Sequence, residues 1–161
     1  MHSLRPAKLR YVFGLMLGLL SSQGYGQNAA LTVAATQPSS HGGNLTFTAS
    51  ATYEQTPQVL GWSVKLPEGW SLVQTGGSHL PEIKPLPGTI TTLEWAYITV
   101  PVSSAQFEFT VFYPAGLDTT QTITAELIVR ADGQTRTVAA PQIVLRPASV
   151  PKKVGPNVQE N

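Results

Sequence analysis

Apolar and polar residues alternate with a period of two along most of this chain, and helical spacing is almost absent. The clearest run covers residues 45–53, where threonine and serine separate the apolar positions. Strict alternation is typical of a strand with one face in the core and the other in solvent. Similar apolar patterns recur at residues 30–36, 59–66, 70–74, 93–97, 107–113, 123–129 and 135–145. The pattern predicts about eight strands.

Glycine, proline, serine and aspartate cluster between these runs, as expected of turns. Short strands at this spacing favour an all-β fold, an immunoglobulin-like antiparallel β-sandwich. We predict one such domain over residues 27–146. Residues 147–161 contain three prolines and few apolar side chains, so we predict a disordered C-terminal tail.

The first detailed turn prediction concerns residues 67–69, Pro-Glu-Gly. This sequence suits a three-residue hairpin loop with glycine in the left-handed position. The loop would pair Leu66 with Trp70, and it would place Trp62 and Trp70 on one buried face.

The second turn prediction concerns Asp132 and Gly133, a strong signal for a type I′ hairpin. This turn would pair Leu127 with Val138. One step further along the strands, it would pair Ala125 with Ala140.

The first 26 residues have the features of an export signal. Three cations among the first ten residues precede an apolar run over residues 11–20, and small residues follow up to Gly26. Spanning a bilayer takes about 20 apolar residues, so this run is too short to remain as an anchor. We therefore predict a signal peptide over residues 1–26 and a mature chain that starts near Gln27. The mature protein would have no stable membrane span and would be secreted, either to a periplasm or outside the cell.

Charge and cysteine content narrow the possible chemistry. The predicted signal peptide holds three of the ten Lys and Arg residues and none of the nine Asp and Glu residues. The mature chain is thus nearly neutral and slightly acidic, and we predict no nucleic-acid partner. Cysteine is absent, which excludes disulfides, thiolate metal ligands and cysteine nucleophiles. A hydrophobic core must carry the stability.

No motif in the chain indicates a reaction. Gly-Trp-Ser occurs at residues 61–63 and 69–71, but the closing glycine of G-x-S-x-G is missing and the predicted setting is a hairpin. His41 and His79 have no partner at a metal-binding spacing. A carboxylate pair assembled across strands keeps a secreted hydrolase as the least favoured alternative. We predict no enzyme, no cofactor and no metal.

The segment over residues 75–90 interrupts the strand pattern with three glycines and three prolines. It is long for a structureless connection, and ordered loops of this length often carry function. We take three of its side chains as candidate binding residues: His79, Glu82 and Lys84. Asn44 begins an Asn-Leu-Thr glycosylation sequon, which we interpret as a turn asparagine while its modification stays open.

Aromatic residues supply a second group of candidates, because sugars stack on exposed flat rings. Five aromatic residues are considered: Trp62, Trp70, Trp95, Tyr97 and Tyr113. The hairpin register favours burial of Trp62 and Trp70, and we take Trp95 and Tyr97 as candidate binding residues. A coplanar, exposed Trp95–Tyr97 pair would favour a carbohydrate-binding module. Burial of the pair would favour a scaffold or adhesin role.

The strand pattern and sequence of residues 61–71, 93–97 and 107–111 resemble those of small β-sandwich modules in bacterial surface and secreted proteins. Their broad relatives are cohesin-like and carbohydrate-module-like immunoglobulin sandwiches. The resemblance covers roughly residues 30–145 and implies architecture more than activity. The chain has no calcium-loop motif, and no functional residue is carried over.

These observations favour an exported, non-catalytic protein that acts by binding or assembly at or outside the cell surface. Its partner would be a protein or a polysaccharide, and edge strands offer one way to bind it. The main alternative is a carbohydrate-binding module.

Overall fold

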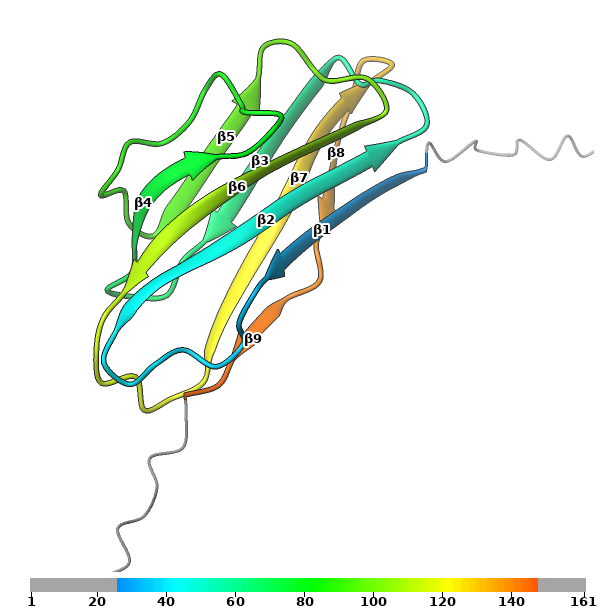
Figure 1. Cartoon of the computed structure of the whole chain (residues 1–161). Coiled ribbons are helices and arrows are strands. Elements are labelled where there is room, and N and C mark those ends of the chain that lie inside the picture. The colour runs from blue at the N-terminus through cyan, green and yellow to red at the C-terminus, as the bar shows by residue number, and fades with distance from the viewer. Residues whose placement is uncertain (1–25, 148–161) are drawn as a thin grey trace, which may run out of the picture.

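The computed structural model describes residues 26–147, so the predicted signal peptide and tail lie outside it apart from Gly26 and Pro147. Two antiparallel sheets form the two layers of a sandwich (Figure 1). Sheet A has the strand order β1 (Gln27–Val33), β2 (Gly43–Tyr53), β6 (Ser104–Tyr113) and β4 (Ser71–Gly76). Sheet B has the order β5 (Thr92–Tyr97), β3 (Val59–Lys65), β7 (Gln121–Ala131) and β8 (Gln134–Ala139), and β9 (Ile143–Leu145) also pairs with β7.

The predicted β-sandwich is confirmed, with nine strands in the described part of the chain in place of about eight. The extra strand arises because residues 135–145 form two strands. β8 pairs with the second half of β7, where Ala139 lies opposite Glu126, whereas β9 pairs with its beginning. Pro141 lies in the break between them, and proline cannot donate a ladder hydrogen bond.

The core lies between the sheets and follows the alternation. Sheet A contributes Phe47, Phe107 and Phe109, and sheet B contributes Trp62 and Trp95. The Trp95 ring centroid lies 5.1 Å from that of Phe107 and 4.9 Å from that of Phe109, so these rings join the two layers. Within the described residues no polar or charged side chain is classed as buried. Apolar burial is therefore the main source of stability.

The predicted hairpin at residues 67–69 is wrong, although the turn and the burial that it implied are present. Gly69 has a φ of +79°, and the Trp70 N–H donates to the Pro67 carbonyl at 3.3 Å. The chain nevertheless crosses here from sheet B to sheet A, because β3 is already paired on both sides and β4 pairs with β6. Trp62 and Trp70 are each 1% exposed because both sheets face one core.

The Asp132–Gly133 hairpin is confirmed. Asp132 and Gly133 have φ values of 49° and 73°, as a type I′ turn requires. Leu127 lies opposite Val138, as the turn predicts. The Ala140 N–H continues the pairing by donating to the Ala125 carbonyl at 2.9 Å.

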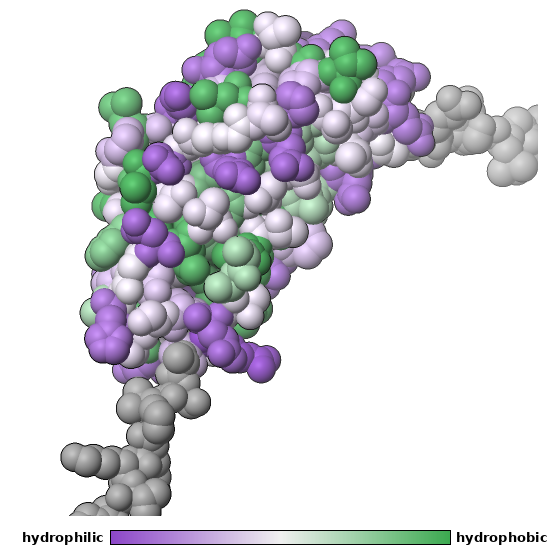
Figure 2. All heavy atoms as spheres, in the orientation of Figure 1, coloured by the Kyte–Doolittle hydropathy of each residue, from purple (hydrophilic) through white to green (hydrophobic). Residues whose placement is uncertain are grey.

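The long connection between β4 and β5, residues 77–91, is ordered without being a regular strand, as predicted; residues 75 and 76 of the predicted segment belong to β4. Figure 2 shows the outer face of sheet A and its surroundings, where polar and weakly polar residues dominate and apolar groups form small separate clusters. The described residues include no helix long and apolar enough to cross a membrane.

Candidate binding site

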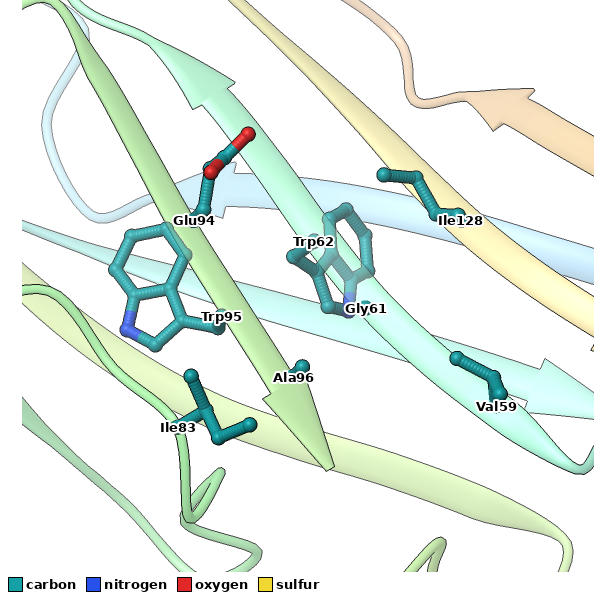
Figure 3. A pocket seen from close by; sticks show the side chains of 8 residues that line it. All are labelled: Val59, Gly61, Trp62, Ile83, Glu94, Trp95, Ala96 and Ile128. Carbon is teal, nitrogen blue, oxygen red and sulfur yellow. The ribbon is translucent and has the colours of Figure 1, made fainter. Parts of the chain in front are cut away.

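The outer face of sheet B carries a hollow of about 300 Å³ (Figure 3). Strands β3, β5 and β7 form its floor, and Ile83 approaches from the 77–91 connection. The outward side chains of Val59, Ala96 and Ile128 complete its apolar lining. Trp62 and Trp95 also border it, but both are buried and their rings belong to the core.

The hollow exists because Gly61 has no side chain. In the ladder Gly61 lies opposite Ala96 on one side and Ile128 on the other, and Ala96 bridges to Ile83. A Cβ at position 61 would lie 3.1 Å from the Trp95 carbonyl oxygen, so the β5 backbone approaches closely here. The sheet therefore has a recess one strand wide between two aliphatic side chains.

The lining is apolar at positions where alternation would place polar residues. Val59 is 40% exposed and Ile83 is 56% exposed, and Ile128 is partly exposed. Ile98, directly after β5 and outside the lining, is 72% exposed. Apolar side chains gathered around a recess mark a contact surface more often than scattered ones do.

Two carboxylates lie beside this apolar surface. Glu94 and Glu126 both lie opposite Ser63, on either side of β3, and both are exposed. Two strand spacings separate them, roughly 10 Å between backbones. This is the cross-strand carboxylate arrangement that spacing in the sequence could not report. Arg130 lies opposite Val59. Lys65 follows Ser63 on the same face of β3, so acidic and basic side chains both flank the apolar row.

Two of the predicted binding residues, Trp95 and Tyr97, lie on β5 with their side chains in the core. Trp95 donates from Nε1 to Thr75 Oγ1 at 3.0 Å, and Tyr97 donates from its hydroxyl to the His79 carbonyl at 2.8 Å. Both rings are buried, so they do not form the exposed pair that a carbohydrate platform requires. Burial raises the pKa of Tyr97, helped by the nearby Tyr53 and Glu82, and this keeps its hydroxyl a neutral donor.

His79 fastens the connection to the edge of sheet A. The His79 backbone N–H donates to the Gln106 carbonyl at 3.0 Å, and the Gln106 backbone N–H donates to the Nδ1 atom of the His79 ring at 3.2 Å. His79 thus takes the place of one strand residue beside β6, with its backbone N–H as donor and its Nδ1 as acceptor. Lys84, the third candidate from this connection, is exposed next to Ile83.

Glu82 fastens the connection to the segment directly after β5. Its two carboxylate oxygens accept from the backbone N–H groups of Ile98 and Thr99 at 3.0 and 3.2 Å. Its own backbone N–H, with those of Ile98 and Thr99, holds its pKa below the ordinary value of 4.5. The geometry brings His79 and Glu82 close to Tyr97, but both contact backbone groups or the core instead of forming an open site. Lys84 is exposed to solvent.

Acid should weaken the Glu82 contact. Because its pKa is lower in the folded chain than in the unfolded chain, its stabilisation is complete above the ordinary value of 4.5 and is lost as the pH falls through the folded-state pKa. Glu82→Gln keeps an acceptor oxygen but loses the charge. Melting temperatures measured from pH 3 to pH 6 should fall less steeply with acid in this variant. Parallel curves for the two proteins would contradict this role.

Sequence reasoning missed the outward-facing residues of the hollow, although Trp95 at its border was a candidate. One signal was available, since a lone glycine inside a strand pattern often marks a close backbone approach, and Gly61 is such a glycine. Val59 and Ile128 were also apolar at outward positions. The contribution of Ile83 was not accessible, because it depends on where an irregular connection returns.

Within residues 26–147 no group of three or more His, Asp or Glu side chains is placed to hold a metal ion. The hollow itself is aliphatic, with Glu94 as its one ionisable lining residue. What it can do physically is accept a protruding apolar group while a cation approaches Glu94.

Comparison with known proteins places the chain by its fold. No family model and no curated protein matches it. Three solved structures are similar: the N-terminal domain of the Streptococcus gordonii adhesin Sgo0707, the major pilin SpaD from Corynebacterium diphtheriae, and a non-cellulosomal cohesin from Archaeoglobus fulgidus. Their TM-scores are 0.57, 0.57 and 0.51, at 11%, 14% and 12% identity, over 75%, 73% and 75% of this chain.

The matches cover 32% of the adhesin chain, 35% of the pilin chain and 93% of the cohesin chain. This chain therefore spans about a third of the first two and nearly all of the third. At such low identity the likeness shows the fold alone, an immunoglobulin-like, cohesin-like β-sandwich. This is the class of module that the sequence resembles.

Proposed function

We propose that this protein is an exported, non-catalytic binding or assembly module, and that its partner docks on the hollow over Gly61. The observation that carries the proposal is the aliphatic recess on the outer face of sheet B, a face where polar residues would be expected. Similar folds in an adhesin, a pilin and a cohesin support the same class of function. Burial of Trp95 and Tyr97 favours the scaffold or adhesin role over sugar stacking.

The chemistry of the recess favours a protein partner over a polysaccharide. Among the described aromatic residues only Phe112, on the outer face of sheet A, is exposed. The hollow instead presents Val59, Ile83 and Ile128, which suit an aliphatic side chain, beside the carboxylate of Glu94. A segment with an aliphatic anchor and a neighbouring lysine or arginine fits both features.

Filling the recess should abolish binding without unfolding the domain. Ala96→Leu places a larger side chain in the hollow, and Ala115→Leu makes the same exchange in the exposed connection after β6. The exported protein would be screened against polysaccharides and against secreted proteins of the organism that produces it. We expect a protein ligand whose affinity falls at least about tenfold with Ala96→Leu and stays unchanged with Ala115→Leu. Equal binding by both variants would refute the assignment of the hollow.

The proposal includes export with removal of the leader. Gly26 directly precedes β1, so cleavage after it would leave every described strand intact. N-terminal sequencing of exported material should find a start at or near Gln27. A membrane-extracted product that retains residues 1–26 would contradict this part of the proposal.

A further inference from the structure

The long connection covers part of both sheet edges on one side of the sandwich. At the β4 edge, the Leu72 N–H donates to the Thr89 carbonyl at 2.9 Å and the Gly88 N–H donates to the Leu72 carbonyl at 2.7 Å. At the β5 edge, Ile83 and Ala96 exchange backbone hydrogen bonds of 3.1 and 3.0 Å. Neither edge can therefore pair with another strand along its full length.

The opposite side of the sandwich ends in β1 and β8 (Figure 1). β8 carries Arg136, and a charge on an edge strand discourages pairing. β1 has the sequence Gln-Asn-Ala-Ala-Leu-Thr-Val, with no charge, no proline and an unbroken register with β2. β9 is a further outer strand, since it pairs only with β7, but its three residues make it a very short edge. Of the five outer strands in the described chain, β1 alone has neither a cover nor one of these protective features.

The free backbone groups of β1 follow from the ladder. The Tyr53 N–H donates to the Ser103 carbonyl, so odd-numbered residues of β2 bond toward β6 and even-numbered ones toward β1. Even residues of β1 lie opposite even residues of β2. The N–H and C=O groups of Ala29 and Leu31 therefore point to the open edge, while those of Ala30 point to β2. After β1 the chain leaves this edge, because the Arg146 N–H donates to the Thr36 carbonyl.

We propose that β1 pairs with β1 of a second copy of this chain, antiparallel and about a two-fold axis at Ala30. In this register the N–H and C=O groups of Ala29 that point to the open edge pair with those of the second copy's Leu31. The other open groups along the strand pair in the same way. Asn28 lies opposite the second copy's Thr32, a polar pair on the outer face. Ala30 lies opposite Ala30 of the second copy, so the smallest side chain on that face lies where the two chains come closest. This surface is separate from the hollow, so the inference does not depend on the proposed function.

Self-pairing suits this edge better than an unrelated strand does. A two-fold pair uses one surface twice, and here it brings together no like charges and no bulky side chains. It joins two copies of sheet A into one continuous sheet. The contact is confined to one strand from each copy, so association should be weak and concentration-dependent.

Sedimentation velocity of the exported protein, from about 10 μM to about 1 mM, tests the association. We expect a monomer–dimer equilibrium. Ala29→Pro removes one open N–H and places its ring at the edge, while the hydrogen bonds to β2 remain. It should weaken the dimer at least about tenfold. Because Ala29 is buried, the melting temperature of the variant is measured alongside to show that the monomer is folded. A monomer at every concentration, or a dimer unaffected by this variant, would overturn the proposal.

A charge swap at the two-fold axis tests the register and remains available if Ala29→Pro fails to fold. Ala30→Lys and Ala30→Glu each place two like charges opposite one another in the homodimer, so each variant alone should be monomeric. Mixed in equal amounts, the two variants should associate, because lysine then faces glutamate. A mixture that associates no better than its components would refute pairing at Ala30.

Discussion

Replacing Trp70 with alanine should lower the free energy of unfolding by about 3–5 kcal/mol, and Trp62→Ala should do the same. Both indoles are 1% exposed in one core, although Trp62 lies in β3 of sheet B and Trp70 directly precedes β4 of sheet A. Trp70 packs on Tyr113 with ring centroids 5.4 Å apart, so its loss leaves a cavity at the end of β6. Denaturant titration measures the change.

Trp62→Phe provides the matched control. The Trp62 Nε1 has no hydrogen-bond partner although it is buried, and an unpaired buried donor costs about 1–3 kcal/mol. Phenylalanine keeps most of the apolar ring and removes that donor. Its loss of stability should therefore be clearly smaller than that of Trp62→Ala. Equal losses, or an unchanged midpoint for Trp70→Ala, would contradict the burial of these rings between the sheets.

Gly77→Ala should destabilise the fold by about 2–4 kcal/mol and loosen the connection from sheet A. Gly77 has a φ of +103°, and a Cβ there would lie 2.9 Å from the Glu108 backbone nitrogen and 3.0 Å from the Phe107 Cα. Backbone cannot move aside as a flexible side chain can. Two residues later, the His79 N–H bonds to Gln106, so a shift at Gly77 should break that contact. Thermal unfolding and hydrogen exchange at His79 measure both effects.

Two other glycines separate the causes. Gly88 has a φ of +86° with open space around its Cβ position, so Gly88→Ala should cost only about 1 kcal/mol. Gly76 has open space and no positive φ, and Gly76→Ala should be nearly neutral. If all three substitutions cost the same, close packing at Gly77 does not hold the connection.

The fold could be predicted largely from local pattern. Alternation in residues 45–53 and the Asp132–Gly133 turn depend on neighbours in the sequence, and the structure agrees with both. The Pro67–Gly69 connection failed because turn chemistry is the same for a hairpin and for a corner between sheets. The partner strand decides between them, and β3 obtains both of its partners from distant segments, β5 and β7.

The candidate site was much less accessible from the sequence. His79 and Glu82 were singled out as ionisable residues of an unusual loop, but their hydrogen bonds lead to backbone groups of residues 106, 98 and 99. Those contacts depend on how the loop folds back across two sheet edges. The hollow depends on Gly61 lying between Ala96 and Ile128, a cross-strand relation that spacing along the chain does not report.

Methyl NMR is the most direct test of a partner docking on the hollow. Isoleucine δ1-methyl labelling provides probes at Ile83 and Ile128 in the lining, at Ile90 elsewhere in the connection, and at Ile123 and Ile143 in the core. Titration with a protein ligand from the binding screen should shift or broaden the Ile83 and Ile128 signals first and leave Ile123 and Ile143 unchanged. A saturable response that spares both Ile83 and Ile128 would contradict the assignment of the hollow as the binding surface.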